Sequence, residues 1–273
     1  MTSQAVLSAP SPSLGVGPLL RRWRDLRRLS QMELALEAEV STRHLSFVET
    51  GRSKPSRDMV VKLAEHLDVP LRERNELLLA AGYAPAYPES SFDDVELVAV
   101  REAVKRLLAA HEPYPAVAVD RRWELLDGNA GVPLITAGAA AHLLEPPINA
   151  LRLSLHPEGM APRIANLAEW RAHVLGRLRR EVHATQDAQL RSLLAELEAY
   201  PGDDAGDVAA TRPEAGEIVV PLRLRSEAGE LSFMSTVTTF GTPLDITVSE
   251  LSIEAFFPAD DHTAAVLRAT LED

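Results

Sequence analysis

The sequence has no cysteine and no long apolar run. None of the 273 residues is Cys, which excludes disulfides, thiolate metal sites and a cysteine nucleophile. No apolar stretch approaches the ~18 residues that a membrane-spanning helix needs. The first residues lack the basic start and the long apolar core of a signal peptide. We therefore expect a cytoplasmic protein that makes no contact with a membrane.

Motifs of catalysis are missing as well. Gly15 and Gly17 have neither the preceding strand nor the third glycine of a dinucleotide-binding loop. No Gly-x-Ser-x-Gly nucleophile elbow occurs. The histidines do not follow a metal-binding spacing; those considered are His142, His156, His173 and His183. We expect no enzyme activity, no metal and no cofactor.

The net charge of −12 is unevenly distributed along the chain. Residues 1–84 hold 12 Lys and Arg against 10 Asp and Glu, and residues 85–273 hold 16 against 30. An acidic surface repels the phosphate backbone of DNA. Any contact with nucleic acid is therefore expected in the first 84 residues.

Residues 30–56 have the spacing of two short helices joined by a tight turn. Ser30 and Glu33 match a capping box at the start of the first helix. Ser41 is placed to cap the second helix, which we expect from Thr42 to Thr50. Gly51 suits the left-handed residue that ends a helix. This pattern predicts a helix-turn-helix, whose second helix enters the DNA major groove.

The second helix turns Arg43 and Phe47 outward by its 100° step per residue. The Arg43 guanidinium can bond guanine O6 and N7 together. Phe47 either contacts a thymine methyl or packs against a neighbouring part of the protein. Gln31 and Ser41 stand at helix starts, where side chain and backbone amide can reach phosphate. The complete set of expected DNA contacts is Gln31, Ser41, Thr42, Arg43, His44, Ser46, Phe47, Arg52, Ser53 and Lys54.

The rest of the N-terminal part frames this motif. Residues 1–17 are uncharged and rich in Ala, Ser, Pro and Gly, so we expect a flexible arm. A DNA-binding domain of five helices is expected over residues 18–84, and Ser56 is placed to cap its fourth helix. The first helix carries arginines that either form a salt-bridged solvated face or touch phosphate. They are Arg21, Arg22, Arg24, Arg27 and Arg28.

The C-terminal part mixes strands and helices. Expected strands are residues 115–120, 123–127, 217–225, 230–240 and 245–256. Expected helices are residues 95–111, 137–144, 148–155, 166–182, 187–200 and 261–271, and residues 201–216 read as a polar loop. Two strands, several helices and three further strands are the order of an α+β PAS-like domain with an antiparallel five-stranded sheet.

The chain resembles a known family in two places. The string SQxxLA followed by VSxxxLSxxExGRxxPS looks like the DNA-binding domain of the XRE family of helix-turn-helix regulators. RHLSFVETGRSKPS and PLRERNELLLAAGYAPAY resemble its MmyB-like branch. Many XRE proteins carry Gly in the turn, where this chain has Glu39. Because Glu tolerates a positive φ poorly, we expect this turn to be less favourable than one with Gly.

The resemblance implies that residues 92–273 form a PAS-like domain that binds a small hydrophobic ligand, with a fatty acid as the best-supported class. The aromatic candidates for its cavity are Trp123, Trp170, Phe233 and Phe240. Asn129, His156 and Arg163 are polar candidates, the last two for a carboxylate. Each has a structural alternative: core packing for the aromatics, a helix cap for Asn129, a turn for His156 and a surface ion pair for Arg163.

These features predict a transcription regulator that binds double-stranded operator DNA as a homodimer, because one recognition helix reads only a few base pairs. A small apolar ligand would control it. Two alternatives stay open: a C-terminal domain that binds a protein partner, and an enzyme fused to a DNA-binding domain.

Overall fold

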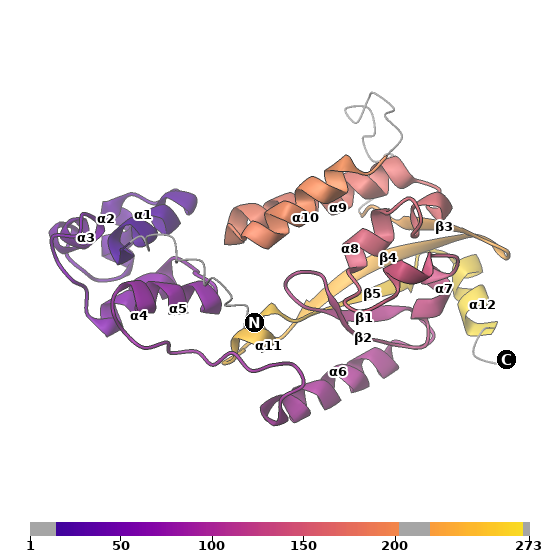
Figure 1. Ribbon diagram of the computed structural model, residues 1–273, viewed down its shortest axis with the longest axis horizontal. Helices are drawn as coiled ribbons and strands as arrows, with labels where there is room; N and C mark the ends of the chain where they lie inside the picture. Colours follow the sequence, from indigo (N-terminus) through magenta and orange to yellow (C-terminus); the bar gives the residue numbers. More distant parts are fainter. Residues whose placement is uncertain (1–14, 202–218, 270–273) are drawn as a thin grey trace, which may run out of the picture. The chain divides into compact units, whose positions relative to one another are not determined.

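A computed structural model of the chain describes residues 15–201 and 219–269. The chain forms two compact units: one runs up to Glu89 and includes residues 244–246, and the other holds the remainder from Ser90 onward. Figure 1 shows helices alone in the first unit and a sheet flanked by helices in the second. Among the described helices, none combines the length and apolar composition that a bilayer span requires.

The first unit is built from five short helices around one core. They are α1 (Val16–Leu26), α2 (Gln31–Glu37), α3 (Thr42–Glu49), α4 (Arg57–His66) and α5 (Leu71–Ala80). Apolar residues from all five form this core, and Leu20, Leu34, Leu45, Leu63 and Leu78 in it are fully buried. Short amphipathic helices such as these derive most of their stability from tertiary packing of the apolar face.

Side-chain caps set the helix starts, as the sequence predicted. The Ser30 hydroxyl accepts the backbone N–H of Glu33, whose carboxylate accepts the N–H of Ser30, so the capping box is present. The Ser41 and Ser56 hydroxyls cap α3 and α4 by accepting the backbone N–H of His44 and of Met59. Gly51 follows α3 with a φ of 72°. These caps satisfy backbone groups that a helix end leaves without intrahelical partners.

The turn between α2 and α3 contains a strained residue. Glu39 adopts a φ of 50°, in the left-handed region that disfavours residues with a Cβ atom. Its carboxylate pairs with Lys62 of α4 at 2.9 Å, on the surface. An exposed ion pair of this kind contributes little to stability. The backbone strain expected from the sequence is therefore present.

The second unit contains a five-stranded antiparallel sheet with the strand order β2-β1-β5-β4-β3. The strands are β1 (Ala116–Val119), β2 (Leu125–Gly128), β3 (Leu222–Ser226), β4 (Gly229–Thr239) and β5 (Ser252–Pro258). The helices are α6 (Val98–Ala110), α7 (Val132–Thr136), α8 (Ala150–Leu155), α9 (Leu167–Thr185), α10 (Ala188–Ala199), α11 (Ile246–Glu250) and α12 (Asp261–Ala269). Short 3₁₀ turns η1 (Val95–Leu97), η2 (Ala141–Leu143) and η3 (Ala161–Arg163) complete it.

The two faces of this sheet pack against different helices. Alternate residues of a strand point to opposite faces, and in β5 Ile253 and Ala255 join the core beneath α6, whereas Phe256 joins the larger core. α8, α9 and α10 cover that second face, and Figure 1 shows α6 on the other side of the sheet. The α+β PAS-like class that the sequence predicted is confirmed.

Two sequence-based predictions of secondary structure in the second unit are wrong. The stretch 137–144 is predicted to be one helix, but α7 precedes it and ends before Gly138, whose φ is 78°, and only the short 3₁₀ turn η2 lies within it. Pro133 is tolerated there because it lies in the first turn of α7. The stretch 245–256 was expected to be one strand, but its first half forms α11 and β5 begins at Ser252. Short apolar runs do not separate a helical turn from a strand by periodicity alone.

The predicted strand 217–225 corresponds to β3, which begins at Leu222. The predicted helix 261–271 corresponds to α12, which the structure describes to Ala269. Residues 1–14 of the predicted arm and residues 202–216 of the predicted polar loop lie outside the described residues.

An ionic network holds α8 against α10. Arg152 donates from Nε and Nη2 to the two carboxylate oxygens of Glu196 at 2.7 and 2.8 Å. The Tyr200 hydroxyl donates to the same carboxylate at 2.5 Å. The hydrogen bonds from Arg152 lower the pKa of Glu196 to about 2. This carboxylate therefore keeps its charge far into the acid range.

Replacing Glu39 with Gly should stabilise the first unit, because glycine adopts a positive φ without a Cβ clash. We expect its thermal unfolding temperature to rise by roughly 2–5 °C. Calorimetry of the full chain measures this temperature. Glu39→Ala is the control, because it removes the same ion pair with Lys62 but keeps the Cβ atom. If Glu39→Gly is no more stable than Glu39→Ala, the turn stores no backbone strain.

Glu196 should make stability depend on pH in the acid range. Its folded pKa of about 2 lies below the ordinary value of 4.5. The stabilisation is therefore complete above about pH 4.5 and is lost as the pH falls toward 2. Denaturant titrations of the wild type and Glu196→Gln at several pH values measure this. Between about pH 4.5 and pH 2 the unfolding free energy of the variant should fall less steeply than that of the wild type. If both proteins lose unfolding free energy at the same rate with falling pH, the lowered pKa of Glu196 is contradicted.

Candidate functional site

A buried ionic network anchors helix α3 on the side that faces the core of the first unit. Glu49, at the end of α3, accepts Nε and Nη2 of Arg24 from α1 at 2.7 and 3.0 Å. It also accepts the side-chain amide of Gln31 from α2 at 2.7 Å. Arg24 and Glu49 are only 8% and 5% exposed, and breaking such a buried pair costs about 3–5 kcal/mol. The network therefore ties three helices together beneath the predicted recognition surface.

The close approach of α1 to α3 depends on a glycine. A Cβ atom placed on Gly17 would lie 2.4 Å from the backbone oxygen of Val48. Real Cβ atoms do not come so near a carbonyl oxygen, so another residue would force the two helices apart. Gly17 and the Arg24–Glu49 pair together fix how α3 sits on α1.

The outer face of α3 carries the side chains that the sequence assigned to DNA. Thr42 and Arg43 are exposed, and His44, Ser46 and Phe47 are half-buried. The Arg43 guanidinium lies 5.4 Å from the centroid of the Phe47 ring. Such a cation–π contact shields one face of an outward aromatic ring. Arg43, in the first turn of α3, therefore lies outside the core with its guanidinium over the ring of Phe47.

Other predicted contacts surround α3. Ser41 is exposed at the start of α3. Arg52 is exposed, Ser53 is half-buried, and Lys54 is exposed with its ammonium 5.0 Å from the centroid of the Tyr83 ring. Gln31 is half-buried, with its amide engaged by Glu49.

The arginines in α1 and directly after it divide between the two interpretations that the sequence left open. Arg24 is buried with Glu49. Arg27 donates to the backbone oxygens of Leu67 and Asp68 at 2.8 Å each. The remaining three are exposed: Arg21, Arg22 and Arg28. Among them, Arg21 forms an exposed ion pair with Asp25 at 3.7 Å, so it fits the salt-bridged solvated face as well as a phosphate contact.

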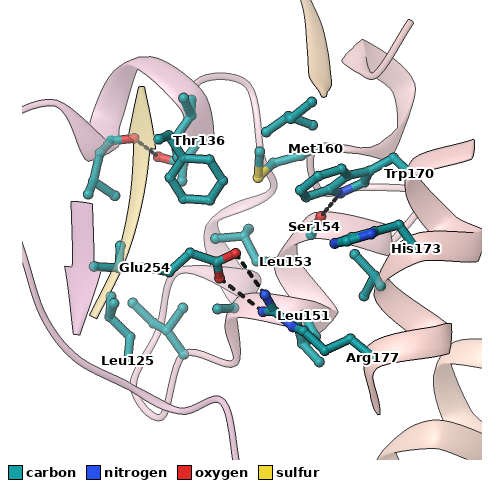
Figure 2. Close-up of a pocket in the computed structure, with 18 residues that line it drawn as sticks. Leu125, Thr136, Leu151, Leu153, Ser154, Met160, Trp170, His173, Arg177 and Glu254 are labelled. Atoms are coloured by element: carbon teal, nitrogen blue, oxygen red, sulfur yellow. Dashed lines mark hydrogen bonds and ion pairs between the residues drawn. The ribbon is translucent and has the colours of Figure 1, made fainter. Parts of the chain in front are cut away.

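The second unit contains a cavity between the sheet and the helices of its larger core (Figure 2). It offers about 60 Å³ of space for the centres of water-sized groups. Its lining comes from β1, β2, β3 and β5 on one side and from α7, α8 and α9 on the other. Most of the lining is apolar: Val117, Leu125, Val132, Ile135, Ile148, Ala150, Leu151, Leu153, Met160, Trp170, Val174, Leu222 and Phe256.

One side of the cavity is polar. Arg177 of α9 donates from both terminal nitrogens to the two carboxylate oxygens of Glu254 in β5, each at 3.1 Å. Figure 2 shows the two side chains pointing toward one another from opposite sides of the cavity. His173 lies one turn before Arg177 and stacks on Trp170 with ring centroids 5.6 Å apart. Burial, reinforced by the charge of Arg177, lowers the pKa of His173 below its usual 6.5.

A second buried carboxyl group lies behind this pair. The Arg177 guanidinium stacks 4.0 Å from the centroid of the Trp123 ring. The Trp123 indole N–H donates to Glu181 of α9 at 2.8 Å. Burial raises the pKa of the Glu181 carboxyl. Trp123 therefore contacts both Arg177 and Glu181.

The predicted ligand residues lie in several places. Of the seven, Trp170 is the one that lines this cavity. Trp123 and Phe233 are buried in the surrounding core, whereas Phe240 packs against the core beneath α6, on the opposite face of the sheet. Asn129, His156 and Arg163 make hydrogen bonds within the protein.

Asn129 is buried, accepts the N–H of Ala116 and donates to the oxygens of Leu108 and Tyr114, so it fixes the start of β1. Arg163 donates to backbone oxygens that include that of Ala137 at 2.7 Å. His156 accepts the backbone N–H of Glu158 at 3.0 Å, within a turn.

Sequence reasoning missed the polar residues of the cavity, although each left a signal. Arg177 lies seven residues after Trp170 and three after Val174, on the apolar side of α9. Glu254 is the one charge within the apolar strand β5. A single charged residue on an otherwise apolar face indicates a buried partner. The partner itself is 77 residues away in the sequence, so pattern alone does not identify it.

A cluster of metal-ligand side chains also forms at the surface of the second unit. His142, His156 and Glu158 have donor atoms within 4.8 Å of one another, although their sequence spacing gave no indication of it. The Nδ1 atom of His156 accepts a backbone N–H, so the neutral ring carries its proton on Nε2. That leaves no free lone pair on this ring, and the cluster is not prepared for a metal.

Comparison with known proteins agrees with this arrangement. Residues 100–269 match the family model of the MmyB-like transcription regulator ligand binding domain, and residues 20–74 match a helix-turn-helix model. A search of curated proteins finds no match. The structure of an RNA-binding light-oxygen-voltage receptor is 14% identical, with a TM-score of 0.24, over 92% of this chain and 62% of that chain. A score this low carries no argument.

The family match covers more than half of the chain and includes α9 and β5, which hold the polar side of the cavity. The helix-turn-helix match includes α2 and α3. The chain therefore joins a helix-turn-helix to an MmyB-like ligand-binding domain, and it belongs to the MmyB-like branch of the XRE family.

Proposed function

We propose that α3 reads the major groove of an operator duplex and that two copies of the chain bind together as a two-fold dimer. The observation that carries the first part is Arg43, which is exposed on α3 while Glu49 of the same helix is buried. A helix held rigidly from below presents its outer side chains in a fixed geometry. One such helix reads only a few base pairs, so paired half-sites are needed for specificity.

In this proposal residues 18–84 are the DNA-binding domain and Arg43 supplies the base contact. The exposed Thr42, Arg52 and Lys54 contact the duplex around it, chiefly at phosphate. Phosphate contacts position a protein on DNA, and base contacts specify the sequence. The protein acts in the cytoplasm, where the operator is.

Residues 92–273 are proposed to form the ligand-binding domain, with the cavity beneath α8 and α9 as its site. A concave, mostly apolar space with a few polar groups is the usual form of a small-molecule site. The family resemblance favours fatty acids. The ligand regulates binding only if its affinity differs between the DNA-competent and incompetent arrangements. We assign to α6 the transmission of ligand binding to the DNA-binding domain. This helix packs against one face of the sheet whose other face borders the cavity.

Arg43→Ala should weaken operator binding by about 1–3 kcal/mol, roughly 5- to 150-fold, and relax the preference at one base position. An operator is first selected from random duplexes with the wild type. Fluorescence anisotropy then compares the variant on this duplex and on single-base substitutions of it.

Arg21→Ala is the matched control, because it removes one exposed positive charge from α1. It should lower affinity equally on all duplexes, with a smaller salt slope, or leave it unchanged. If Arg43→Ala also loses affinity equally on every duplex, Arg43 contacts phosphate and does not read a base.

Filling the cavity should uncouple DNA binding from the ligand. Native mass spectrometry of the full-length wild type should show a dimer that retains a small apolar molecule. Val174→Phe adds bulk where Val174 lines the cavity, so it should carry no ligand and bind the operator identically with or without the molecule released from the wild type. A wild type that releases nothing and behaves like Val174→Phe would favour a protein partner for this domain.

A further inference from the structure

Helix α7 lies between the cavity and a groove on the surface of the same unit. Val132, Ile135 and Thr136 of this helix line the cavity, and Figure 2 shows Thr136 beside it. Leu134 points the other way by the 100° step per residue. It lines the groove together with residues of η3, β3 and α12. A single short helix therefore forms the wall between the cavity and the groove.

The first residues of α7 are fixed in place. A Cβ atom on Gly131 would lie 2.8 Å from the backbone oxygen of Pro113, so the chain is tightly packed where the helix begins. The Asn129 side chain accepts the N–H of Gly131 at 3.2 Å, and its backbone oxygen accepts the N–H of Val132 at 3.1 Å. The same side chain accepts the N–H of Ala116 in β1. This end of α7 is therefore tied to the sheet.

One side chain holds the other end of α7. Arg163 of η3 donates from Nη1 to the backbone oxygens of Ile135 at 3.2 Å and Ala137 at 2.7 Å, and from Nη2 to that of Leu134 at 3.4 Å. A helix leaves its last carbonyl oxygens without intrahelical donors, and a cation beside them is favourable. The Nε atom donates to the backbone oxygen of Arg225 in β3 at 3.2 Å. Arg163 therefore ties the C-terminal end of α7 to the edge of the sheet.

The chain directly after α7 has space around it. Ala137 and Gly138 are exposed. Gly138 has a φ of 78°, and a Cβ atom placed on it would meet no described atom within 4 Å. The backbone is anchored again at Ala140, whose N–H donates to the oxygen of Glu158 at 2.8 Å. Residues 132–139 thus run between two fixed points, and the guanidinium of Arg163 holds them in the middle.

We propose that α7 is a gate through which an apolar ligand passes between the groove and the cavity, and that Arg163 is the positioning residue that keeps the gate closed. The inference rests on the proposed role of the cavity as the ligand site. Segments that cover binding sites belong to the locally less stable parts of a fold, and their opening controls entry and release. Release of three carbonyl oxygens by Arg163 frees α7 to turn about its fixed first residues. Arg163 then acts on access to the cavity, in place of the carboxylate contact expected from the sequence.

Because the chain has no cysteine, one introduced thiol can report the opening of the gate. Ser154 lines the cavity and is 7% exposed, so Ser154→Cys places a thiol behind α7. Its alkylation by iodoacetamide is followed by mass spectrometry of the full chain, after bound apolar molecules are removed on a lipid-binding resin. The rate follows the open population when the gate closes faster than the thiol reacts. Adding Arg163→Ala should raise this rate roughly five- to tenfold, because hydrogen bonds from a charged donor favour the closed form. An unchanged rate overturns the proposal.

A second thiol distinguishes a gate from a general loosening of the unit. Val104 is fully buried in the core beneath α6, on the other face of the sheet. Arg163→Ala should leave the alkylation rate of Val104→Cys unchanged. If the thiols at positions 104 and 154 both react faster by the same factor, Arg163 stabilises the whole unit and the gate is refuted.

Arg225→Ala is the matched control for the loss of charge. Arg225 lines the same groove, but the hydrogen bond that its guanidinium donates within the described part of the chain goes to Pro162 of η3, at 3.4 Å. Alkylation of Ser154→Cys should keep its rate in this background, and an acceleration equal to that of Arg163→Ala refutes the role of Arg163. Arg163→Lys keeps the charge without the planar fork of donors, so it should give an intermediate rate. If Arg163→Ala does not fold, Arg163→Lys decides, and a wild-type rate in it overturns the proposal.

The gate and the site can fail separately, because alkylation needs no ligand. A wild type that retains no apolar molecule in native mass spectrometry removes the cavity as the ligand site, and the gate loses its function with it. A wild type that retains such a molecule, while the alkylation of Ser154→Cys is indifferent to Arg163, keeps the site and refutes the gate.

Discussion

A buried charge must have an opposite charge beside it, and both units of this protein are organised around such a pair. In the first unit Arg24 and Glu49 join α1 to α3. In the second, Arg177 and Glu254 join α9 to β5. Each pair connects elements that are distant in the sequence, so it forms only when the surrounding fold is complete. Buried pairs add little net stability compared with apolar residues, but breaking one is costly.

The two pairs have different consequences because their surroundings differ. Arg24 and Glu49 lie among helices packed by fully buried leucines. There the Arg24–Glu49 pair holds α3 against α1, which sets the position of the outer face of α3. Arg177 and Glu254 border an open volume, so there the same type of pair gives a mostly apolar lining its charged groups.

The distribution of charge along the chain separates the two tasks. The first 84 residues have a slight excess of positive charge, and the remainder is strongly acidic. Acidic residues on the ligand-binding domain discourage contact with phosphate and favour approach to DNA through the helix-turn-helix. Within the basic part, some arginines in or next to α1 are not available to DNA, because Arg24 and Arg27 form hydrogen bonds inside the protein. The total charge of a segment therefore overstates the charge that it can offer to DNA.

The sequence by itself determined the local structure and the family. Ser30, Ser41 and Ser56 cap helices because a cap needs only a hydroxyl and the next three residues. The motif from Ser30 to Ser56 identified the helix-turn-helix because its caps and its apolar spacing are likewise local features of the sequence. The order of strands and helices was sufficient for the PAS-like class.

The tertiary structure alone decided the lining of the cavity and the exact form of the irregular segments. Of the predicted ligand residues only Trp170 lines the cavity, because a cavity depends on which side chains fail to fill a space, and no local pattern encodes that. The Arg177–Glu254 pair spans 77 residues, and strand pairing in the sheet brings its members together. The segment 245–256 became α11 and β5 rather than one strand, since the tertiary context overrides the β propensity of Ile246, Thr247 and Val248.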